Sequence, residues 1–284
     1  MFINLYTDFG FKRIFGREAN QHMTSHFFNA LQVCPQPINR LIFKPNTYVA
    51  DSADERRAVV DLHAENERGE ALYIEMQRAR QTYFKDRSLY YLSTSVKDQA
   101  VVGEKWNYQL KPVYSVSLMN FNFKDTPSDK LVHRVKLMDE QTCKVFYSKL
   151  TMLYVELPKF TKTLEELASD LDVWLYCIQH MHEFKERPPS LQFGIFTQVF
   201  NVADIAKMTR EERDHYHESL KHQWDMNGVR DYYTTEGRQE GHKEGRQERT
   251  LEMAQVMLQN NEPLEKVLMY TGLSEAVIQG LMKK

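Results

Sequence analysis

Apolar and polar residues alternate along two neighbouring stretches, from Val59 to Leu62 and from Ala71 to Gln77, and this period of two predicts a pair of β-strands. A polar segment from Asn66 to Glu70 separates the stretches. It contains Gly69, which can adopt the positive φ that a hairpin loop of three to five residues requires. The two strands are therefore expected to form an antiparallel β-hairpin.

Two acidic residues, Asp61 and Glu75, interrupt these strands, although acids are depleted in strands and are rarely buried without a partner. A three-residue loop over 67–69 would place the two acids directly opposite each other, with Gln77 on the same face as Glu75. Opposed like charges destabilise a sheet, and a divalent cation such as Mg²⁺ between them would turn repulsion into attraction.

Two alternatives to this cation site stay open. The acids could form the solvated polar face of an ordinary hairpin. Hairpin registers slip easily, so a second loop length is possible. A two-residue loop at Arg68-Gly69 would place Met76, instead of Glu75, opposite Asp61.

Periodic patterns predict further strands and helices on both sides of the hairpin. Strands are expected over 110–123, 131–138 and 145–157, with an edge strand or loop over 41–50. Helices are expected after a short aromatic segment within 7–32, from Phe84 to about Gly103, and over about 164–181. Together they predict an α/β fold with a mixed sheet flanked by helices.

The chain becomes charged and helical towards its end. Thr209 to Glu212 is a capping box that predicts a helix start. Gly237, Gly241 and Gly245 then follow at intervals of four, which would place them on one helix face open to close approach by another helix. The last residues predict a helix-turn-helix shape, and packing or dimerisation explains it better than base recognition. A flexible linker is the alternative for the glycine repeat.

Composition bounds the class of protein. The 284 residues are 42% hydrophobic and 27% charged, as in globular domains, and the net charge is −2, so nucleic-acid binding would need a local basic patch. The three cysteines give no disulfide framework, and neither a signal peptide nor a membrane span is visible. A cytoplasmic protein without a membrane partner is expected.

Several segments together resemble a known family. They are TDFGFKRIFGRE (7–18), YIEMQ (73–77), FKDRSLYY (84–91), LKPVYSVSLMNF (110–121), VELPKF (155–160) and the glycine-punctuated tail. In this order they resemble the Rpn recombination-promoting nucleases, also labelled transposases, of the PD-(D/E)XK nuclease superfamily. The resemblance implies a restriction-endonuclease-like core over residues 1–200 and a helical C-terminal region over 201–284.

The resemblance also implies a site. Asp61 and Glu75 would hold Mg²⁺ or another divalent cation, assisted by the carbonyl of Met76. Glu18 would be a third acidic catalytic residue, although a carboxylate at that position could simply stabilise a helix start. Gln77 takes the place of the lysine usual in the superfamily; its amide can hydrogen-bond water but cannot act as a base.

A basic and aromatic segment follows the hairpin. From it, Arg78, Lys85, Arg87 and Tyr91 are expected to contact DNA phosphates, which positions a nucleic acid without reading its sequence. The alternative is a solvated basic face of an ordinary amphipathic helix.

The family resemblance therefore predicts a metal-dependent DNA endonuclease that hydrolyses phosphodiester bonds and is linked to recombination, mobile elements or phage defence. A homodimer formed through the C-terminal helices is expected. The main alternative is a catalytically degenerate DNA-binding or assembly protein that retains the fold. A true transposase would need strand-transfer activity, and no further acidic triad is visible in the sequence.

Overall fold

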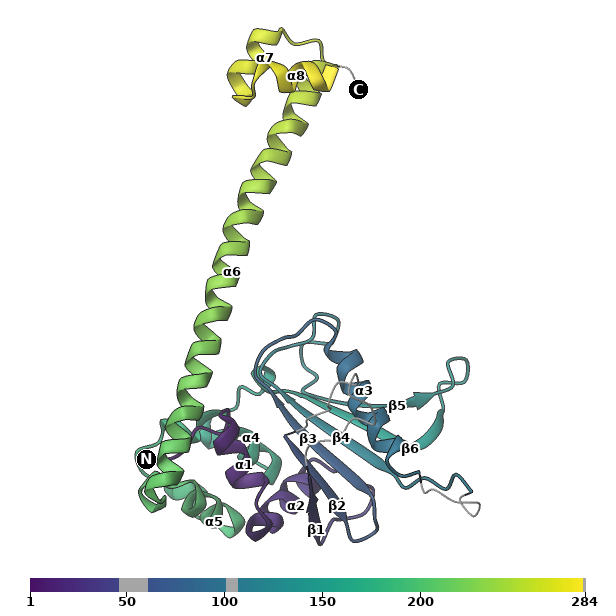
Figure 1. Cartoon of the computed structure of the whole chain (residues 1–284), viewed down its shortest axis with the longest axis vertical. Helices are drawn as coiled ribbons and strands as arrows, with labels where there is room; N and C mark the ends of the chain where they lie inside the picture. The colour runs from purple at the N-terminus through teal and green to yellow at the C-terminus, as the bar shows by residue number, and fades with distance from the viewer. Residues whose placement is uncertain (46–60, 101–106, 283–284) are drawn as a thin grey trace. The chain divides into compact units, whose positions relative to one another are not determined.

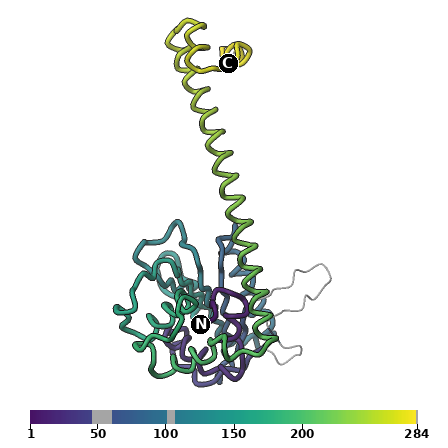
Figure 2. Tube along the Cα trace, turned by 90° about the vertical axis from the view of Figure 1, so that its left-hand side faces the viewer, coloured from purple at the N-terminus to yellow at the C-terminus, as the bar shows by residue number. Residues whose placement is uncertain are grey.

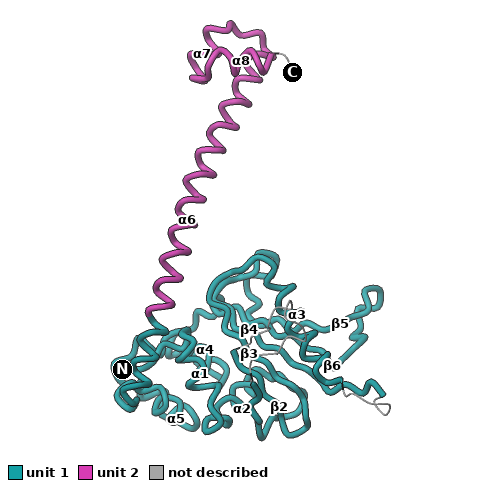
Figure 3. Tube along the Cα trace, in the orientation of Figure 1, with its two compact units in different colours: residues 1–220 teal, residues 221–284 magenta. Residues whose placement is uncertain are grey.

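The computed structural model describes residues 1–45, 61–100 and 107–282. Packing divides the chain into two compact units, residues 1–220 and 221–284 (Figure 3). The division into a nuclease domain over 1–200 and a helical region over 201–284, expected from the sequence, stays a prediction. Within the described residues, no helix combines the length and apolar character that crossing a bilayer requires.

The first unit is built on one sheet. Among the described residues it has six strands in the order β1-β2-β3-β4-β6-β5 (Figure 1). Their bounds are β1 Leu41–Lys44, β2 Leu62–Asn66, β3 Ala71–Gln77, β4 Val113–Met119, β5 Val132–Met138 and β6 Val145–Glu156. The pairs β3–β4 and β4–β6 are parallel, and the other neighbours are antiparallel. The sheet is therefore mixed, and the predicted fold class is confirmed.

Helices cover both faces of this sheet. The buried residues of α1 (Asp8–Phe15), α2 (Gln21–Ala30), α4 (Asp170–His180) and α5 (Gly194–Ala203) share one core with the inward side chains of β2 and β3 (Figure 1). The opposite face meets α3 (Phe84–Lys97), whose Leu92 packs on Tyr73 and Val113. Because side chains alternate along β3, Leu72, Ile74 and Met76 enter the main core, whereas Tyr73, Glu75 and Gln77 lie on the α3 side.

Three helix predictions need correction. The aromatic segment at the N-terminus is itself the helix α1, capped by Thr7, whose Oγ1 accepts from Gly10 N at 2.9 Å. Helix α3 ends at Lys97 rather than near Gly103, which lies outside the described residues. Helix α4 starts only at Asp170, because Ser169 forms a capping box with Asp172.

The N-terminal segment lies beside the end of α5. Phe2 forms a β-bridge with Asp204, and Ile3 N donates to Ala203 O at 3.0 Å. Figure 2 marks the N-terminus of the chain within the first unit. Helix α6 (Arg210–Gln259) begins at the predicted capping box, since Thr209 N donates to the Glu212 carboxylate at 3.1 Å. The glycine repeat is helical within α6.

The second unit contains the C-terminal part of α6 with α7 (Leu264–Thr271) and α8 (Glu275–Met282). Ala254, Val267 and Ile278 form its small apolar core. Gly272, at φ 65°, caps α7 and makes the predicted turn between the two short helices. The helix-turn-helix shape predicted from sequence is confirmed.

Candidate active site

The β2–β3 hairpin has the register that opposes the two acids. Asn66 N donates to Glu70 O at 3.1 Å, which closes a loop of three residues, and Gly69 takes the left-handed φ of 73°. The ladder pairs Leu62 with Ile74, so the next step outward brings Asp61 opposite Glu75. The alternative with a two-residue loop is wrong. Val59 and Val60 lie outside the described residues.

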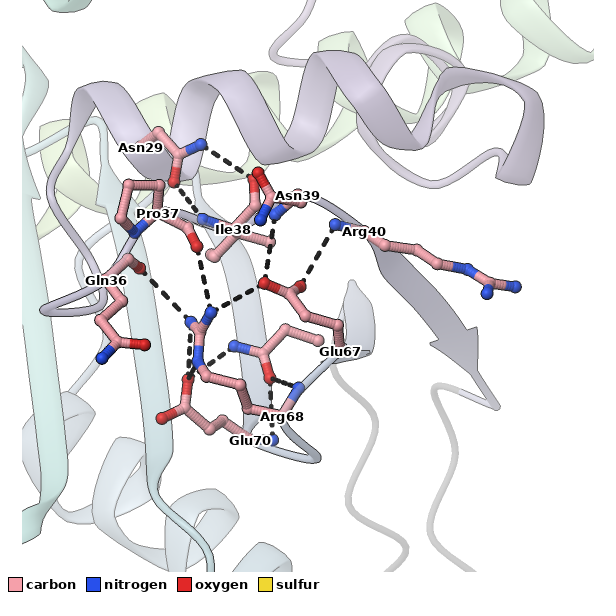
Figure 4. Close-up of polar contacts among 10 residues, drawn as sticks. Asn29, Gln36, Pro37, Ile38, Asn39, Arg40, Glu67, Arg68 and Glu70 are labelled. Atoms are coloured by element: carbon pink, nitrogen blue, oxygen red, sulfur yellow. Dashed lines mark hydrogen bonds and ion pairs between the residues drawn. The ribbon is translucent and has the colours of Figure 1, made fainter.

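The hairpin turn is anchored to the segment before β1 (Figure 4). The Arg68 guanidinium donates to the carbonyls of Pro37 and Gln36 at 3.0 and 3.3 Å, and it pairs with Glu70 at 2.9 Å. Glu67 accepts from Arg40 N at 3.2 Å. These contacts fix the length and position of the turn, and therefore the register of the acids at the far end of the hairpin.

Asp61 lies in a bend immediately before β2, and its carboxylate reaches across to β3. Its Oδ2 accepts from Met76 N at 2.7 Å, while the Met76 side chain is buried in the main core. The neighbouring Glu75 side chain is only 15% exposed. Two largely buried carboxylates therefore share the end of one hairpin.

This proximity changes the pKa of both acids. Burial raises the pKa of Glu75 to about 7; the Asp61 charge adds to this, against the opposing effects of Arg87 and a hydrogen bond with Gln77. Burial also raises the pKa of Asp61, although the Met76 hydrogen bond acts in the other direction. A positive charge between the acids would relieve this cost of ionisation.

Arg87, on α3, supplies part of that positive charge. Its guanidinium lies 3.1 Å from Glu75 Oε1 and also donates to Gln77 Oε1. Because the Gln77 oxygen is an acceptor here, its amide nitrogen is left as the donor. Gln77 is buried, so its amide is held in a fixed position beside Glu75.

The other predicted DNA contacts surround the same site. Tyr91 is half-buried, and its pKa is raised by burial and then by Glu75 and Asp61, with Arg87 acting in the opposite direction. Lys85 is exposed and pairs with Asp125 at 2.9 Å. The Nε atoms of Arg78 and Arg87 are buried, and within the described part of the chain neither has a hydrogen-bond partner. Such donors are suited to an anionic oxygen.

Glu18 is exposed in a short 3₁₀ turn, Glu18–Asn20. No contact among the described residues joins it to Asp61 or Glu75, so its role stays a prediction. Sequence reasoning missed two charged residues, Asp8 and Lys12, in the same 7–18 segment as Glu18. Asp8 raises the pKa of Asp61, and Lys12 lowers it. These two residues pair with each other at 2.9 Å on one turn of α1. They lie in the TDFGFK segment, whose spacing does not indicate that it approaches Asp61.

The donor chemistry of the acidic pair fits a hard divalent cation. Within the described residues, no group of three or more His, Cys, Asp or Glu side chains is arranged to hold a metal. A cation at Asp61 and Glu75 would therefore need water or substrate oxygens to complete its coordination. Mg²⁺ is commonly bound in this way, by one or two carboxylates plus waters and phosphate oxygens.

Comparison with known proteins identifies the family of the chain. No curated protein and no solved structure matches the chain. The family model described as PD-(D/E)XK nuclease family transposase matches residues 5–233, which include the whole sheet and all the site residues above. This match spans well over half of the 284 residues and confirms the superfamily resemblance drawn from the sequence. The chain belongs to the PD-(D/E)XK nuclease family transposases.

Proposed function

We propose that the protein is a magnesium-dependent DNA endonuclease that acts in recombination, mobile-element biology or phage defence. Membership of a nuclease family of transposases supports phosphodiester chemistry and an association with mobile elements. The observation that carries the proposal is the opposition of Asp61 and Glu75 across one hairpin, with the pKa of Glu75 raised to about 7.

The roles of the residues follow from their positions. A bound divalent cation would lower the pKa of water and stabilise charge on the phosphoryl group. Asp61 and Glu75 would hold it through carboxylate oxygens, with the Met76 carbonyl and Glu18 as the further proposed contributors. The Gln77 amide would orient a water molecule by donating a hydrogen bond, and it cannot take up a proton.

The basic residues would position the DNA strand. Arg78 and Arg87 would direct their guanidinium charge towards a phosphate, and Lys85 lies exposed on the first turn of α3. Tyr91 lies beside Arg87, whose guanidinium carbon is 5.8 Å from the tyrosine ring centre. Contacts of this kind fix the backbone and leave sequence choice to other surfaces.

One observation favours the alternative of a DNA-binding protein without catalysis. Arg87 contacts both Glu75 and Gln77, so the site already holds one positive charge where a cation would bind. Together with the glutamine in place of the usual lysine, this arrangement could hold the site in an inactive state that still binds phosphate.

Plasmid cleavage separates the two functions. Wild-type protein should nick or linearise supercoiled DNA with Mg²⁺ and not with EDTA, and Asp61→Ala and Glu75→Ala should each abolish cutting. Glu65→Ala is the matched control, because it removes a β2 carboxylate that instead pairs with Lys44 at 2.8 Å. Cutting retained by both site variants refutes the site, whereas DNA binding without any cutting supports the alternative.

We also propose that the protein forms a homodimer through its C-terminal helices. A Cβ built on Gly237, Gly241 or Gly245 meets nothing within 4 Å, so this face of α6 is accessible to a second helix. Sedimentation of the full chain should give a dimer, and Gly241→Leu should shift it towards monomer because the side chain blocks close approach. A wild-type monomer at micromolar concentration would contradict the proposal.

A further inference from the structure

Two pockets adjoin at the first turn of α3, beside the acidic site. The larger, of about 730 Å³, is lined by aromatic rings and by Arg80, Lys85 and Lys124, which outnumber its two acids, Asp86 and Asp125, and we call it the cationic pocket. The smaller, of about 350 Å³, has mainly apolar walls that include Met152 and Tyr154, and we call it the aromatic pocket. Lys85, Asp86 and Phe123 line both pockets, so the two are neighbours that share part of their walls.

A single buried carboxylate holds the wall of the aromatic pocket. Glu156, in the VELPKF segment, is fully buried at the end of β6. Its oxygens accept from Phe123 N at 2.8 Å, from Thr126 Oγ1 at 2.8 Å and from His133 Nε2 at 2.5 Å. All three of these residues line the aromatic pocket. The pocket is therefore pre-formed rather than a gap between mobile side chains.

The charge on Glu156 also determines which ring nitrogen of His133 donates a hydrogen bond. Lys159 Nζ contacts the carboxylate at 2.8 Å, and although burial acts against ionisation, the hydrogen bonds lower the pKa of Glu156. An ionised carboxylate can only accept, so His133 donates through Nε2 and its Nδ1 is an acceptor when the ring is neutral.

Aromatic rings provide a surface suited to a planar ligand. Phe84, Phe121, Phe123 and Tyr154 pack edge to face or tilted, with centroids 5.6 to 6.4 Å apart. The Tyr154 hydroxyl is fixed by Ser88 Oγ at 2.7 Å. Lys85 Nζ lies 4.9 Å from the Phe123 ring centre, so a positive charge already accompanies the aromatic surface.

Arg87 lies between the cationic pocket and the acidic site. The Arg87 guanidinium lies 5.6 Å from the ring centre of Phe84, which lines the cationic pocket, and 3.1 Å from Glu75 Oε1. A ligand in the pockets would therefore be a near neighbour of any phosphodiester held at Asp61 and Glu75.

We propose that these pockets bind one unstacked nucleotide of a DNA strand. The base would lie in the aromatic pocket against Phe123, and its flanking phosphates would lie near Arg80 and Lys124. Asp125 is paired with Lys85 at 2.9 Å, which reduces its repulsion of a phosphate. The proposal rests on the proposed function in taking DNA as the ligand, and it names the substrate as a single-stranded or locally unpaired region.

Binding of labelled oligonucleotides in EDTA, where no cleavage occurs, tests this assignment. We expect a 12-nucleotide single strand and a duplex with one bulged base to bind about tenfold more tightly than the fully paired duplex. Phe123→Leu should weaken the first two about tenfold, because base–aromatic stacking is lost while the backbone contact to Glu156 stays. Phe146→Leu, at a ring that is 82% exposed on β6, is the matched control.

Salt dependence distinguishes the two pockets. Lys124→Ala should reduce the slope of log affinity against log salt by about 0.7, the value for one phosphate contact on a single strand. Phe123→Leu should leave this slope unchanged. Equal binding of single strand and paired duplex, wild-type affinity in Phe123→Leu, or tighter binding of RNA of the same sequence would each overturn the proposal. Thermal melting of each variant verifies folding.

Failure of this proposal can be told from failure of the nuclease proposal. Absence of plasmid cutting with a retained dependence of oligonucleotide binding on Phe123 would remove the nuclease activity and keep the pocket. Metal-dependent cutting by the wild-type protein, together with normal oligonucleotide binding by Phe123→Leu, would keep the nuclease activity and remove the nucleotide pocket.

Discussion

Replacing Glu75 by glutamine should stabilise the metal-free protein at alkaline pH. Burial first, and then the Asp61 charge, raise the pKa of Glu75 from its ordinary 4.5 to about 7. The folded state therefore binds this proton more tightly than the unfolded chain, and stability falls as pH rises from 4.5 towards 7. Since each tenfold change in proton affinity is worth about 1.4 kcal/mol, the interval corresponds to about 3 kcal/mol.

Little of this energy should be lost to solvent screening, because the Glu75 side chain is 15% exposed. Urea unfolding in EDTA should give equal stability for wild type and Glu75→Gln at pH 4. At pH 8 the variant should be more stable by about 1–3 kcal/mol. Glu65→Gln controls for the loss of one carboxylate from the same hairpin at an exposed ion pair.

Magnesium should reverse the difference. A cation that binds only the folded wild-type protein raises its stability by mass action, and Glu75→Gln should respond much less. Parallel stability curves from pH 4 to pH 8 would refute the reasoning, as would a variant that is less stable at every pH. The second result would mean that the ion pair with Arg87 outweighs burial.

Three further predictions concern other charges. Burial opposes ionisation of Glu212, but hydrogen bonds from Arg13 and Arg17 hold its pKa at about 2. Glu212→Gln should therefore lower the free energy of unfolding in urea by about 2–3 kcal/mol at pH 7. This difference from wild type should vanish as pH falls from 4.5 to 2. Glu156→Leu should lower stability by about 3–5 kcal/mol in the same assay, because it leaves the buried Lys159 ammonium unpaired; an unchanged midpoint contradicts this. Arg87→Met should weaken duplex binding and reduce its salt slope by about 0.9, and an unchanged slope in a salt titration would exclude a phosphate contact.

Local patterns were enough to predict the hairpin and the sheet. Gly69 marked the turn, and the alternation from Ala71 to Gln77 gave a strand whose odd-numbered residues share one face, as the structure has it. The capping box at Thr209 likewise marked the start of α6. These features depend on neighbours within a few residues, so a single sequence contains them.

Contacts between distant segments could not be read in the same way. Asp8 and Lys12 influence Asp61 because α1 lies close to the end of the hairpin, and no local pattern announces that proximity. The same holds for Glu156, whose partners come from residues up to 33 positions away. The aromatic residues of α1 were predicted to precede a helix rather than to form one. The helix has only 8 residues, which is a short stretch for a periodic pattern, and the burial of its rings depends on contact with α5.

The anchored turn of the hairpin has an evolutionary consequence. Because side chains alternate with a period of two, loss of one codon between Leu62 and Asn66, with the turn held in place by its anchors, would turn Asp61 over towards the main core. An inert copy of this gene could thus arise with every acidic residue intact. Among relatives, the number of residues between this turn and each acid is as informative as the identity of the acids when active copies are to be told from decayed ones.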